Sequence, residues 1–444
     1  MNINREILRL SVPAVVSNIT VPLLGLCDTG ISGHLGSERF LAAIAVGSMM
    51  LNVVFWLFGF LRMGTTGLTA KAYGAGDDHQ LKEIFSCSVF IATVLGMLLI
   101  AFREPVLRLL LVVVQPEADI AGLVRRYFEI SIGAAPAMLC VMAVSGWFVG
   151  MQTTFWPMVI AISVNVINIA ASFILVFYVG CGFKGVAIGT FIANWAGAFI
   201  AILAAWKFRR GKGLVVSVLD IGDAGLLLRF FKVNVNLFFR SFCIISVSLA
   251  VTAAGARLGS MTLAVNAVMM QFFTLFSFFM DGFAFSGEAL VGRCYGARDV
   301  KMLTKSVNSL LVWSLCVALL FTLIYVTGYG CLVDVLTDED SVRAGVRAMS
   351  IWIWLLPLVS VWAFIYDGFY VGITDTGSML IATLLSTLVF MGFAFVRIEG
   401  GAISIGVSSN NYLWFAFMSY LFLRGLILSL MWRRRVNKSC VRGH

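Results

Sequence analysis

Seven ionisable residues lie inside long apolar segments of this sequence, where a charge is expensive. A charged side chain at the centre of a bilayer-spanning helix costs about 2.5 to 3.5 kcal/mol on insertion scales. Charged residues inside spanning helices usually face a cavity or a partner, so they are the first candidates for chemistry. They are Asp28, Arg62, Arg240, Asp281, Glu288, Asp367 and Arg424.

The acidic members of this set point to proton or cation chemistry. Asp28 lies some twenty residues into the first apolar segment, and we expect a functional carboxylate there, with an end-of-helix carboxylate as the alternative. Asp281 and Glu288 are seven residues apart, about two helical turns, and so share a face. An ion pair with Arg240 in the preceding segment is an equally open interpretation of Asp281. Asp367 has no basic neighbour in its own segment, which favours a wet cavity.

Uncharged polar residues in the fifth and sixth apolar segments add possible partners for a carboxylate. Asn168 and Ser172 are four residues apart on one helical face, and Thr190 follows in the next segment. Hydrogen bonding between packed helices is the alternative role for all three. A buried carboxylate beside such groups can hold a proton, because desolvation disfavours its charged form. Oxygen ligands can equally hold Na⁺ at Asp28 or Asp367, and the spacing leaves both possibilities open.

The composition identifies the elements that must position these residues. Of 444 residues, 60% are apolar and only 12% are charged, whereas a soluble domain has about 45 to 50% apolar and about 25% charged residues. A spanning helix needs about 20 residues. We therefore predict an all-α integral membrane protein with about twelve spans, near 8–33, 40–70, 85–102, 126–150, 155–179, 185–206, 227–253, 262–290, 304–327, 347–372, 377–396 and 405–432.

An internal repeat divides the chain into two halves. Tyr73-Gly-Ala-Gly-Asp77 recurs as Tyr295-Gly-Ala-Arg-Asp299, and Gly146-Trp-Phe-Val-Gly150 recurs as Gly368-Phe-Tyr-Val-Gly372, both at an offset of 222 residues. A third pair, Leu-Gly-Ser, recurs at an offset of 223. Six spans in each half make the repeats parallel, with a substrate path expected between them. We predict an amino-terminal six-helix lobe over 1–206, a cytoplasmic linker over 207–225, and a carboxy-terminal lobe with a basic tail over 226–444.

Charge sets the expected orientation and excludes some partners. Alternating the twelve spans places nineteen Lys and Arg on the side of both termini and ten on the other. The positive-inside rule then makes both termini and the linker cytoplasmic, in a multi-pass protein of the cell (inner) membrane. Membrane topology therefore explains the net charge of +10, and nucleic acid is not an expected partner. The lipid bilayer is an expected partner, and we expect the protein to be a monomer.

The sequence lacks the catalytic and metal-binding motifs that several enzyme classes need. The histidines, His34, His79 and His444, stand outside the predicted span interiors, so no paired-His zinc motif is possible. The nine cysteines include no CxxC pair, and no Walker-type phosphate loop is present. We therefore expect a non-enzyme without a cofactor, driven by an ion gradient rather than ATP. The abundant phenylalanines suit lipophilic cations, through apolar contact and cation–π attraction.

Three stretches resemble the multidrug and toxic compound extrusion (MATE) family, and its DNA-damage-inducible protein F subgroup in particular. They are Pro13 to Asp28 (PAVVSNITVPLLGLCD), Leu41 to Asp77 and Gly255 to Asp299. The resemblance implies a secondary antiporter with two six-helix lobes around a central cleft that opens alternately to each side. Such proteins export drugs or other toxic organic compounds, often cations, against inward flow of protons or sodium ions.

The resemblance also assigns roles by position in the amino-terminal lobe. Asp28 is similar to the family's coupling carboxylate, Pro13 lies near a proposed bend, and Asn168 and Thr190 match polar partners of that acid. Ser172 stands where the subgroup usually has a second acid. This departure leaves fewer negative charges around Asp28 and argues against a coupling site with two carboxylates. We favour protons as the coupling ion, with sodium as the alternative.

In the carboxy-terminal lobe, Asp367 resembles a carboxylate implicated in cation coupling or substrate contact. Asp281 and Glu288 match the subgroup's DGFAF…EAL pattern and, with Arg240, form a substrate cavity or a structural polar network. A lipid-linked oligosaccharide flippase is the alternative function, and an integral-membrane enzyme is a weaker one. The flippase would need a large basic cavity for pyrophosphate, which the few embedded arginines argue against.

Overall fold

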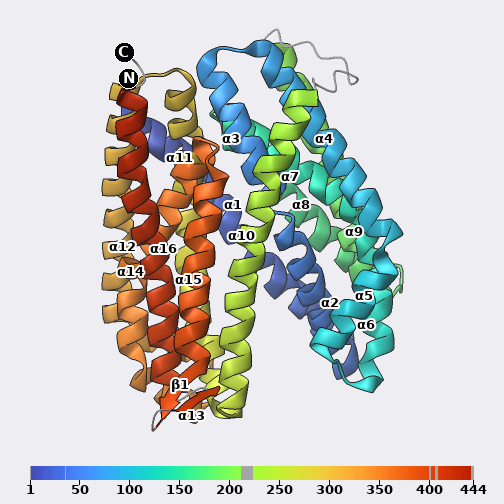
Figure 1. The fold of residues 1–444 in the computed structure, drawn as a ribbon. Coiled ribbons are helices and arrows are strands. Elements are labelled where there is room, and N and C mark those ends of the chain that lie inside the picture. Colours follow the sequence, from blue (N-terminus) through green and yellow to red (C-terminus); the bar gives the residue numbers. More distant parts are fainter. Residues whose placement is uncertain (1, 36, 212–223, 400–401, 406–408, 442–444) are drawn as a thin grey trace. The chain divides into compact units, whose positions relative to one another are not determined.

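Long helices dominate the computed structural model, which describes residues 2–35, 37–211, 224–399, 402–405 and 409–441 (Figure 1). In this part of the chain twelve helical stretches are long and apolar enough to cross a membrane. The predicted all-α membrane fold is therefore confirmed. By their contacts the residues form two compact units, which are Val12–Asn234 and the combination of Met1–Ser11 with Val235–His444.

The unit Val12–Asn234 contains most of the first nine helices (Figure 1). A 3₁₀ turn, Ile132–Ala134, joins α6 to α7, and a π-helical turn, Ile174–Tyr178, ends α8. The helices are α1 (Ile3–Gly33), α2 (Glu38–Leu57), α3 (Phe60–Ala75), α4 (Asp78–Ala101), α5 (Arg103–Val114), α6 (Ala118–Ser131), α7 (Ala135–Gly150), α8 (Phe155–Phe173) and α9 (Phe183–Gly211).

The other unit contains the later helices and a short hairpin. Its strands pair antiparallel with Val396 opposite Ile405, where the sequence predicted only a connection between spans. The elements are α10 (Ala224–Arg257), α11 (Ser260–Gly296), α12 (Val300–Leu336), α13 (Asp340–Ala348), α14 (Ser350–Gly372), α15 (Thr376–Phe395), β1 (Val396–Glu399), β2 (Ala402–Ile405) and α16 (Asn410–Val441).

The repeated YGAGD and YGARD stretches fold into the same turn in both units. The fourth residue has a left-handed backbone in each case, with φ of 69° at Gly76 and 57° at Arg298. The next residue, Asp77 or Asp299, caps the following helix and accepts a 2.9 Å hydrogen bond from the backbone N–H three residues later. The sequence repeat is therefore also a structural repeat.

Close helix packing repeats as well. A Cβ atom on Gly146 of α7 would clash with the backbone carbonyl of Arg62 in α3. A Cβ atom on Gly368 of α14 would clash in the same way with the carbonyl of Ala284 in α11. Both glycines and both carbonyls are related by the offset of 222. Small residues let helix backbones approach closely in membranes, so each unit uses one glycine of the GxxVG motif to join its second and fourth spans.

One proline explains where the two halves differ. The helix α12 is continuous over a stretch that the other unit divides into α4 and α5. Pro105, the third residue of α5, has no N–H to donate to the carbonyl of Ala101 four residues earlier, and it therefore interrupts the helix. The position in α12 that corresponds to Pro105 is Thr327, which has an N–H.

Several helices begin before the predicted spans. The helix α4 begins at Asp78 rather than near 85, α6 at Ala118 rather than near 126, and α12 at Val300 rather than near 304. Apolar windows report only the part of a helix that matches the bilayer. The polar first turns are helical too, and in α4 and α12 the side chains of Asp77 and Asp299 cap them.

The first helix of each half contributes to both units. The unit boundary falls between Ser11 and Val12 in α1 and between Asn234 and Val235 in α10, positions related by an offset of 223. The predicted lobes 1–206 and 226–444 stay predictions. Of the predicted linker, residues 207–211 complete α9, 224 and 225 begin α10, and 212–223 lie outside the described residues.

Candidate functional site

Asp28 lies in the last third of α1, a helix that contains two prolines, Pro13 and Pro22. Its side chain is half-buried, and its Oδ1 atom is buried. Among the described residues none forms a hydrogen bond with that oxygen. Burying a polar atom without a hydrogen bond costs free energy. The carboxylate is therefore suited to take up a proton or a cation at this atom.

Tyr127 of α6 is an electrostatic neighbour of Asp28 that no sequence pattern indicated. Its side chain is only 2% exposed, and the Asp28 carboxylate acts electrostatically on its hydroxyl. That hydroxyl forms a 2.9 Å hydrogen bond with the hydroxyl of Ser48 in α2. A Cβ atom on Gly47, the residue before Ser48, would clash with the Tyr127 ring, so the glycine makes room for it.

The three polar residues predicted from the fifth and sixth spans are brought together. Asn168 of α8 donates a 3.2 Å hydrogen bond to the hydroxyl of Thr190 in α9, and it accepts one of 3.2 Å from Ser172. Thr190 also interacts with the Tyr127 hydroxyl. We call Asp28, Tyr127, Asn168, Ser172 and Thr190 the amino-terminal polar cluster; they come from α1, α6, α8 and α9.

The local backbone around Ser172 is unusual. A π-helical turn at Ile174–Tyr178 begins two residues after it, and such turns are frequent at functional sites. A Cβ atom on Gly189 of α9 would clash with the Ser172 hydroxyl and backbone. Close approach of α8 and α9 therefore depends on this glycine and positions Asn168 next to Thr190.

A second buried group lies in the other unit. Asp367 of α14 accepts hydrogen bonds through Oδ2 from both Arg240 of α10 and Arg424 of α16. The three side chains are between 6% and 8% exposed. Arg424 also donates to the hydroxyl of Tyr420 at 3.5 Å. These contacts join three helices through one carboxylate.

The ion triad of Asp367, Arg240 and Arg424 differs from the environment that the sequence predicts for Asp367. A wet cavity was expected because its own span has no basic residue, but the structure buries Asp367 between two arginines from other helices. Arg240, which the sequence offered as a partner for Asp281, binds Asp367. Partnerships between distant spans cannot be read from spacing within one span. The coupling role of Asp367 stays a prediction.

The remaining predicted acids lie on α11. Glu288 is 1% exposed, and Asp281 is half-buried. The α14 backbone approaches α11 beside Glu288, because a Cβ atom on Gly372 would lie 2.9 Å from the Glu288 carbonyl. Their assignment to a substrate cavity or a structural network stays a prediction.

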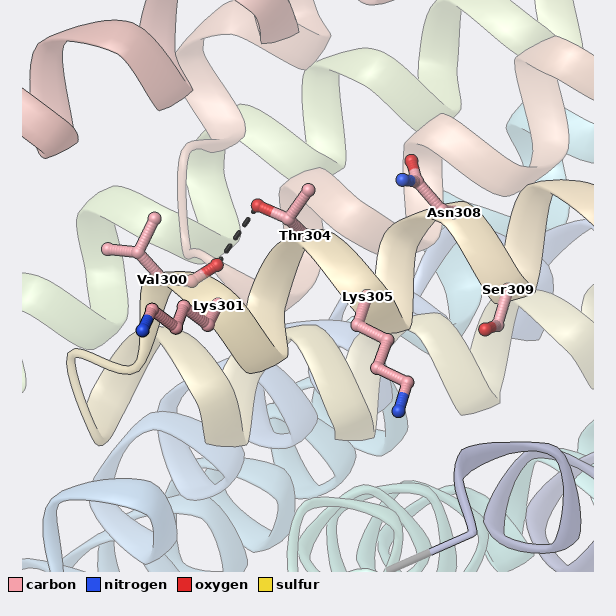
Figure 2. A pocket seen from close by; sticks show the side chains of 6 residues that line it. All are labelled: Val300, Lys301, Thr304, Lys305, Asn308 and Ser309. Carbon is pink, nitrogen blue, oxygen red and sulfur yellow. Dashed lines mark hydrogen bonds between the residues drawn. The ribbon is translucent and has the colours of Figure 1, made fainter.

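A pocket of about 520 Å³ lies along the first turns of α12, and none of its lining residues is a predicted site residue (Figure 2). Two lysines and three uncharged polar side chains contribute to its lining, so it is basic. The lining residues are Val300, Lys301, Thr304, Lys305, Asn308 and Ser309.

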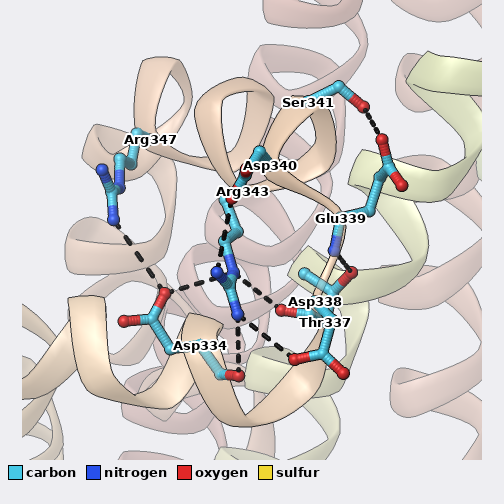
Figure 3. Close-up of polar contacts among 8 residues, drawn as sticks. All are labelled: Asp334, Thr337, Asp338, Glu339, Asp340, Ser341, Arg343 and Arg347. Carbon is cyan, nitrogen blue, oxygen red and sulfur yellow. Dashed lines mark hydrogen bonds and ion pairs between the residues drawn. The ribbon is translucent and has the colours of Figure 1, made fainter.

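The opposite end of α12 carries a polar cluster centred on Arg343 of α13 (Figure 3). Arg343 donates to the carbonyl of Thr337 at 2.8 Å and contacts Asp334 at 3.3 Å. Arg347, one turn later, lies 3.9 Å from Asp334. These contacts hold α13 against the end of α12.

The repeat places a related cluster in the other unit. Arg125, which corresponds to Arg347 at the offset of 222, binds Glu104 of α5 at 2.6 Å. Hydrogen bonds from Arg108 and then Arg125 hold the pKa of the Glu104 carboxyl below its ordinary value. In both units, arginine–carboxylate contacts therefore link the carboxy-terminal end of the third span to the helix that follows it.

Comparison with known proteins agrees with this architecture. Residues 13–174 and 237–396 each match the MatE family model, and the two matches divide the chain as its repeat does. DNA damage-inducible protein F of Escherichia coli is 34% identical over 431 residues, which cover 97% of this chain and 92% of that protein. Multidrug and toxin extrusion protein 1 of Danio rerio is 23% identical over a stretch that covers 98% of this chain and 74% of that protein.

A solved structure confirms the two-lobe fold. The crystal structure of a MATE protein in the bent conformation has a TM-score of 0.88 to this chain, with 17% identity and coverage of 100% and 97%. The twelve helical stretches make the protein a multi-pass membrane protein. Members of the MatE family are membrane transporters of small molecules rather than enzymes. With both halves matched and a relative 34% identical over almost its whole length, this chain belongs to the MatE family of multidrug and toxic compound extrusion transporters.

Proposed function

We propose that this protein is a proton-coupled antiporter of the cell (inner) membrane that exports toxic organic compounds, often cations, by alternating access. The observation that carries the proposal is Asp28, whose buried Oδ1 forms no hydrogen bond with any described residue. A carboxylate within a spanning helix is costly unless it has a partner. A transported ion that binds and leaves supplies that partner in one part of the cycle only.

The amino-terminal polar cluster favours a proton over sodium. A hard cation needs several oxygen ligands, but the oxygens nearby are already used within the protein. Asn168 Oδ1 accepts from Ser172, and the Thr190 hydroxyl accepts from Asn168 and donates to the carbonyl of Val186. A proton needs only one carboxylate oxygen, which Asp28 has.

The backbone of α1 offers a hinge for the transport cycle. Pro13 lies inside this helix, directly after Val12, where the unit boundary falls. A proline inside a helix removes one hydrogen bond and permits bending. We infer that bending at Pro13 links occupation of Asp28 by an ion to movement of the lobes. In the proposed arrangement both termini lie in the cytoplasm, and the monomer is the transporting unit.

Cationic substrates follow from the same charge arrangement. Protonation and deprotonation of Asp28 change the negative charge available to a cation, so proton and substrate compete for it. A relative is named as a multidrug and toxin extrusion protein, which supports organic substrates for this chain. The coupling ion is the only small ligand besides substrate in this proposal, and no cofactor is part of it.

A flippase for lipid-linked oligosaccharides has less support. Such a protein needs guanidinium or ammonium groups that can bind pyrophosphate inside the membrane. The buried arginines Arg240 and Arg424 instead both bind Asp367. The carboxylate of Asp367 therefore balances part of their positive charge, which leaves less of it to attract a diphosphate.

A dye-efflux panel tests the export function. Cells that produce the protein are loaded with cationic, neutral and anionic dyes, and efflux is compared for the natural sequence, Asp28→Asn and Asp119→Asn. Asp119 is a matched control because it is exposed and binds Arg39 at 3.0 Å. We expect efflux of cationic dyes that Asp28→Asn abolishes and Asp119→Asn leaves unchanged. Efflux restricted to anionic dyes would overturn the substrate class.

A further inference from the structure

The basic pocket on α12 consists of side chains from one helix (Figure 2). Lys301 and Lys305 are exposed and one turn apart, and Figure 2 shows both side chains on the same side of α12. Asn308 adds an amide and Ser309 a hydroxyl one turn further on. The Thr304 hydroxyl donates to the carbonyl of Val300 at 3.0 Å. The pocket therefore offers two positive charges and neutral donors to an anion.

The same face of α12 continues as an exposed apolar surface. Val312 is 61% exposed, Leu319 is 52% exposed and Leu323 is 59% exposed. These residues follow Lys301, Lys305 and Asn308 at steps of three, four or seven, which is one face of a helix. Val312 to Leu323 extends about 16 Å at 1.5 Å per residue, about half of a 30 Å hydrocarbon core. The apolar face therefore has the length of one lipid leaflet.

The corresponding part of α4 does not have this charge. At the offset of 222, Lys301 corresponds to His79 and Lys305 to Glu83, and these two side chains contact each other at 3.5 Å. The basic pair is therefore specific to α12 rather than a property of the repeat.

We propose that this face of α12 binds an anionic phospholipid. The phosphodiester lies between the ammonium groups of Lys301 and Lys305, within reach of the Asn308 amide and the Ser309 hydroxyl. One acyl chain lies along Val312, Leu319 and Leu323. Charge complementarity selects the anionic headgroup, and the continuous apolar face selects a lipid over a soluble phosphate compound. The site is independent of Asp28 and of the transport mechanism.

Native mass spectrometry of the full chain tests the site. The protein is reconstituted in nanodiscs of phosphatidylcholine with one fifth phosphatidylglycerol, released, and its bound lipids are counted. A basic residue near a membrane contributes about 1 kcal/mol, so we expect Lys301→Gln with Lys305→Gln to lower retention of phosphatidylglycerol about thirty-fold. Lys82→Gln, in the first turns of α4, is the matched control and should retain it.

Two further arms separate a lipid from free phosphate. Val312→Ser with Leu319→Ser should weaken retention of phosphatidylglycerol, and inorganic phosphate at millimolar concentration should not displace it. Displacement by inorganic phosphate would assign the site to a soluble anion and overturn the proposal. Equal retention of both lipids, or undiminished retention in the double lysine variant with an unchanged melting temperature, would overturn it as well.

Discussion

Arg293 of α11 donates a 2.8 Å hydrogen bond to the carboxylate of Glu6 in the first turn of α1, 287 residues away in the sequence. Ser11 and Ser286 form a second bond of 2.7 Å between the same helices. The repeat counterparts differ in charge. Lys71 corresponds to Arg293 at the offset of 222, and Arg229 corresponds to Glu6 at the offset of 223 that relates α1 to α10. Lys71 and Arg229 act on each other as like charges. An ion pair with Arg293 therefore holds the start of α1. At the start of α10 the corresponding two residues are both basic, so they cannot form such an ion pair with each other.

Glu6→Gln should destabilise the protein by about 0.5 to 1 kcal/mol, since the pair is partly exposed and such pairs contribute little. Thermal unfolding in one detergent measures the change. A double-mutant cycle with Arg293→Gln supplies the control, because it isolates the interaction between the two residues. Additive losses would show that the pair does not stabilise the start of α1.

Asp367→Asn should destabilise the protein by about 3 to 5 kcal/mol, because it leaves Arg240 and Arg424 buried without a countercharge. The free energy of unfolding measures this loss. Simultaneous replacement of all three residues by apolar side chains of similar volume should restore much of it. A fully stable Asp367→Asn protein would contradict the structural role of the ion triad.

Gly146→Ala and Gly368→Ala should each lower stability by about 1 to 3 kcal/mol or more, since each added methyl group meets a backbone carbonyl. Gly122→Ala is the matched control: it lies in the helix α6 with no atom within 4 Å of the added Cβ and should be neutral or slightly stabilising. Melting temperatures of the three variants decide the matter. Equal values would contradict the close packing of α3 with α7 and of α11 with α14.

Tyr127→Phe should retain the ring that packs on Gly47 and lose the hydroxyl that binds Ser48. We expect about 1 kcal/mol less stability and slower proton-driven efflux, because Asp28 loses its polar neighbour. Efflux rates in proteoliposomes at several pH values show the effect. Ser48→Ala separates the two roles, since it removes that bond while keeping the Tyr127 hydroxyl beside Asp28. A Tyr127→Phe protein with an unchanged rate and pH profile would exclude Tyr127 from the coupling site.

The spans and the repeat were predictable because both depend on patterns along the chain. Apolar length identifies a spanning helix without any knowledge of its neighbours. The repeated motifs carry local backbone demands, such as the left-handed residue before Asp77 and Asp299. The break at Pro105 also had a sequence signal, but the long apolar run around it concealed α5.

Contacts between distant helices were not predictable in the same way. The ion triad unites residues 240, 367 and 424 from three spans, and no spacing along the chain relates them. Tyr127 escaped notice because one tyrosine in an apolar segment has no distinguishing pattern, and only burial beside Asp28, Ser48 and Thr190 gives it importance. Asn168 and Thr190 were found because polar residues are rare in spanning helices and the family resemblance assigned them a common site.

Asp28 is the residue that we propose couples ion entry to export. Efflux of a cationic dye from proteoliposomes should be measured under a proton gradient alone and then under a sodium gradient alone, for the natural sequence and for Asp28→Asn of equal melting temperature. We predict efflux that the proton gradient drives, that the sodium gradient does not drive, and that Asp28→Asn abolishes. Unchanged proton-driven efflux in folded Asp28→Asn protein would contradict the account.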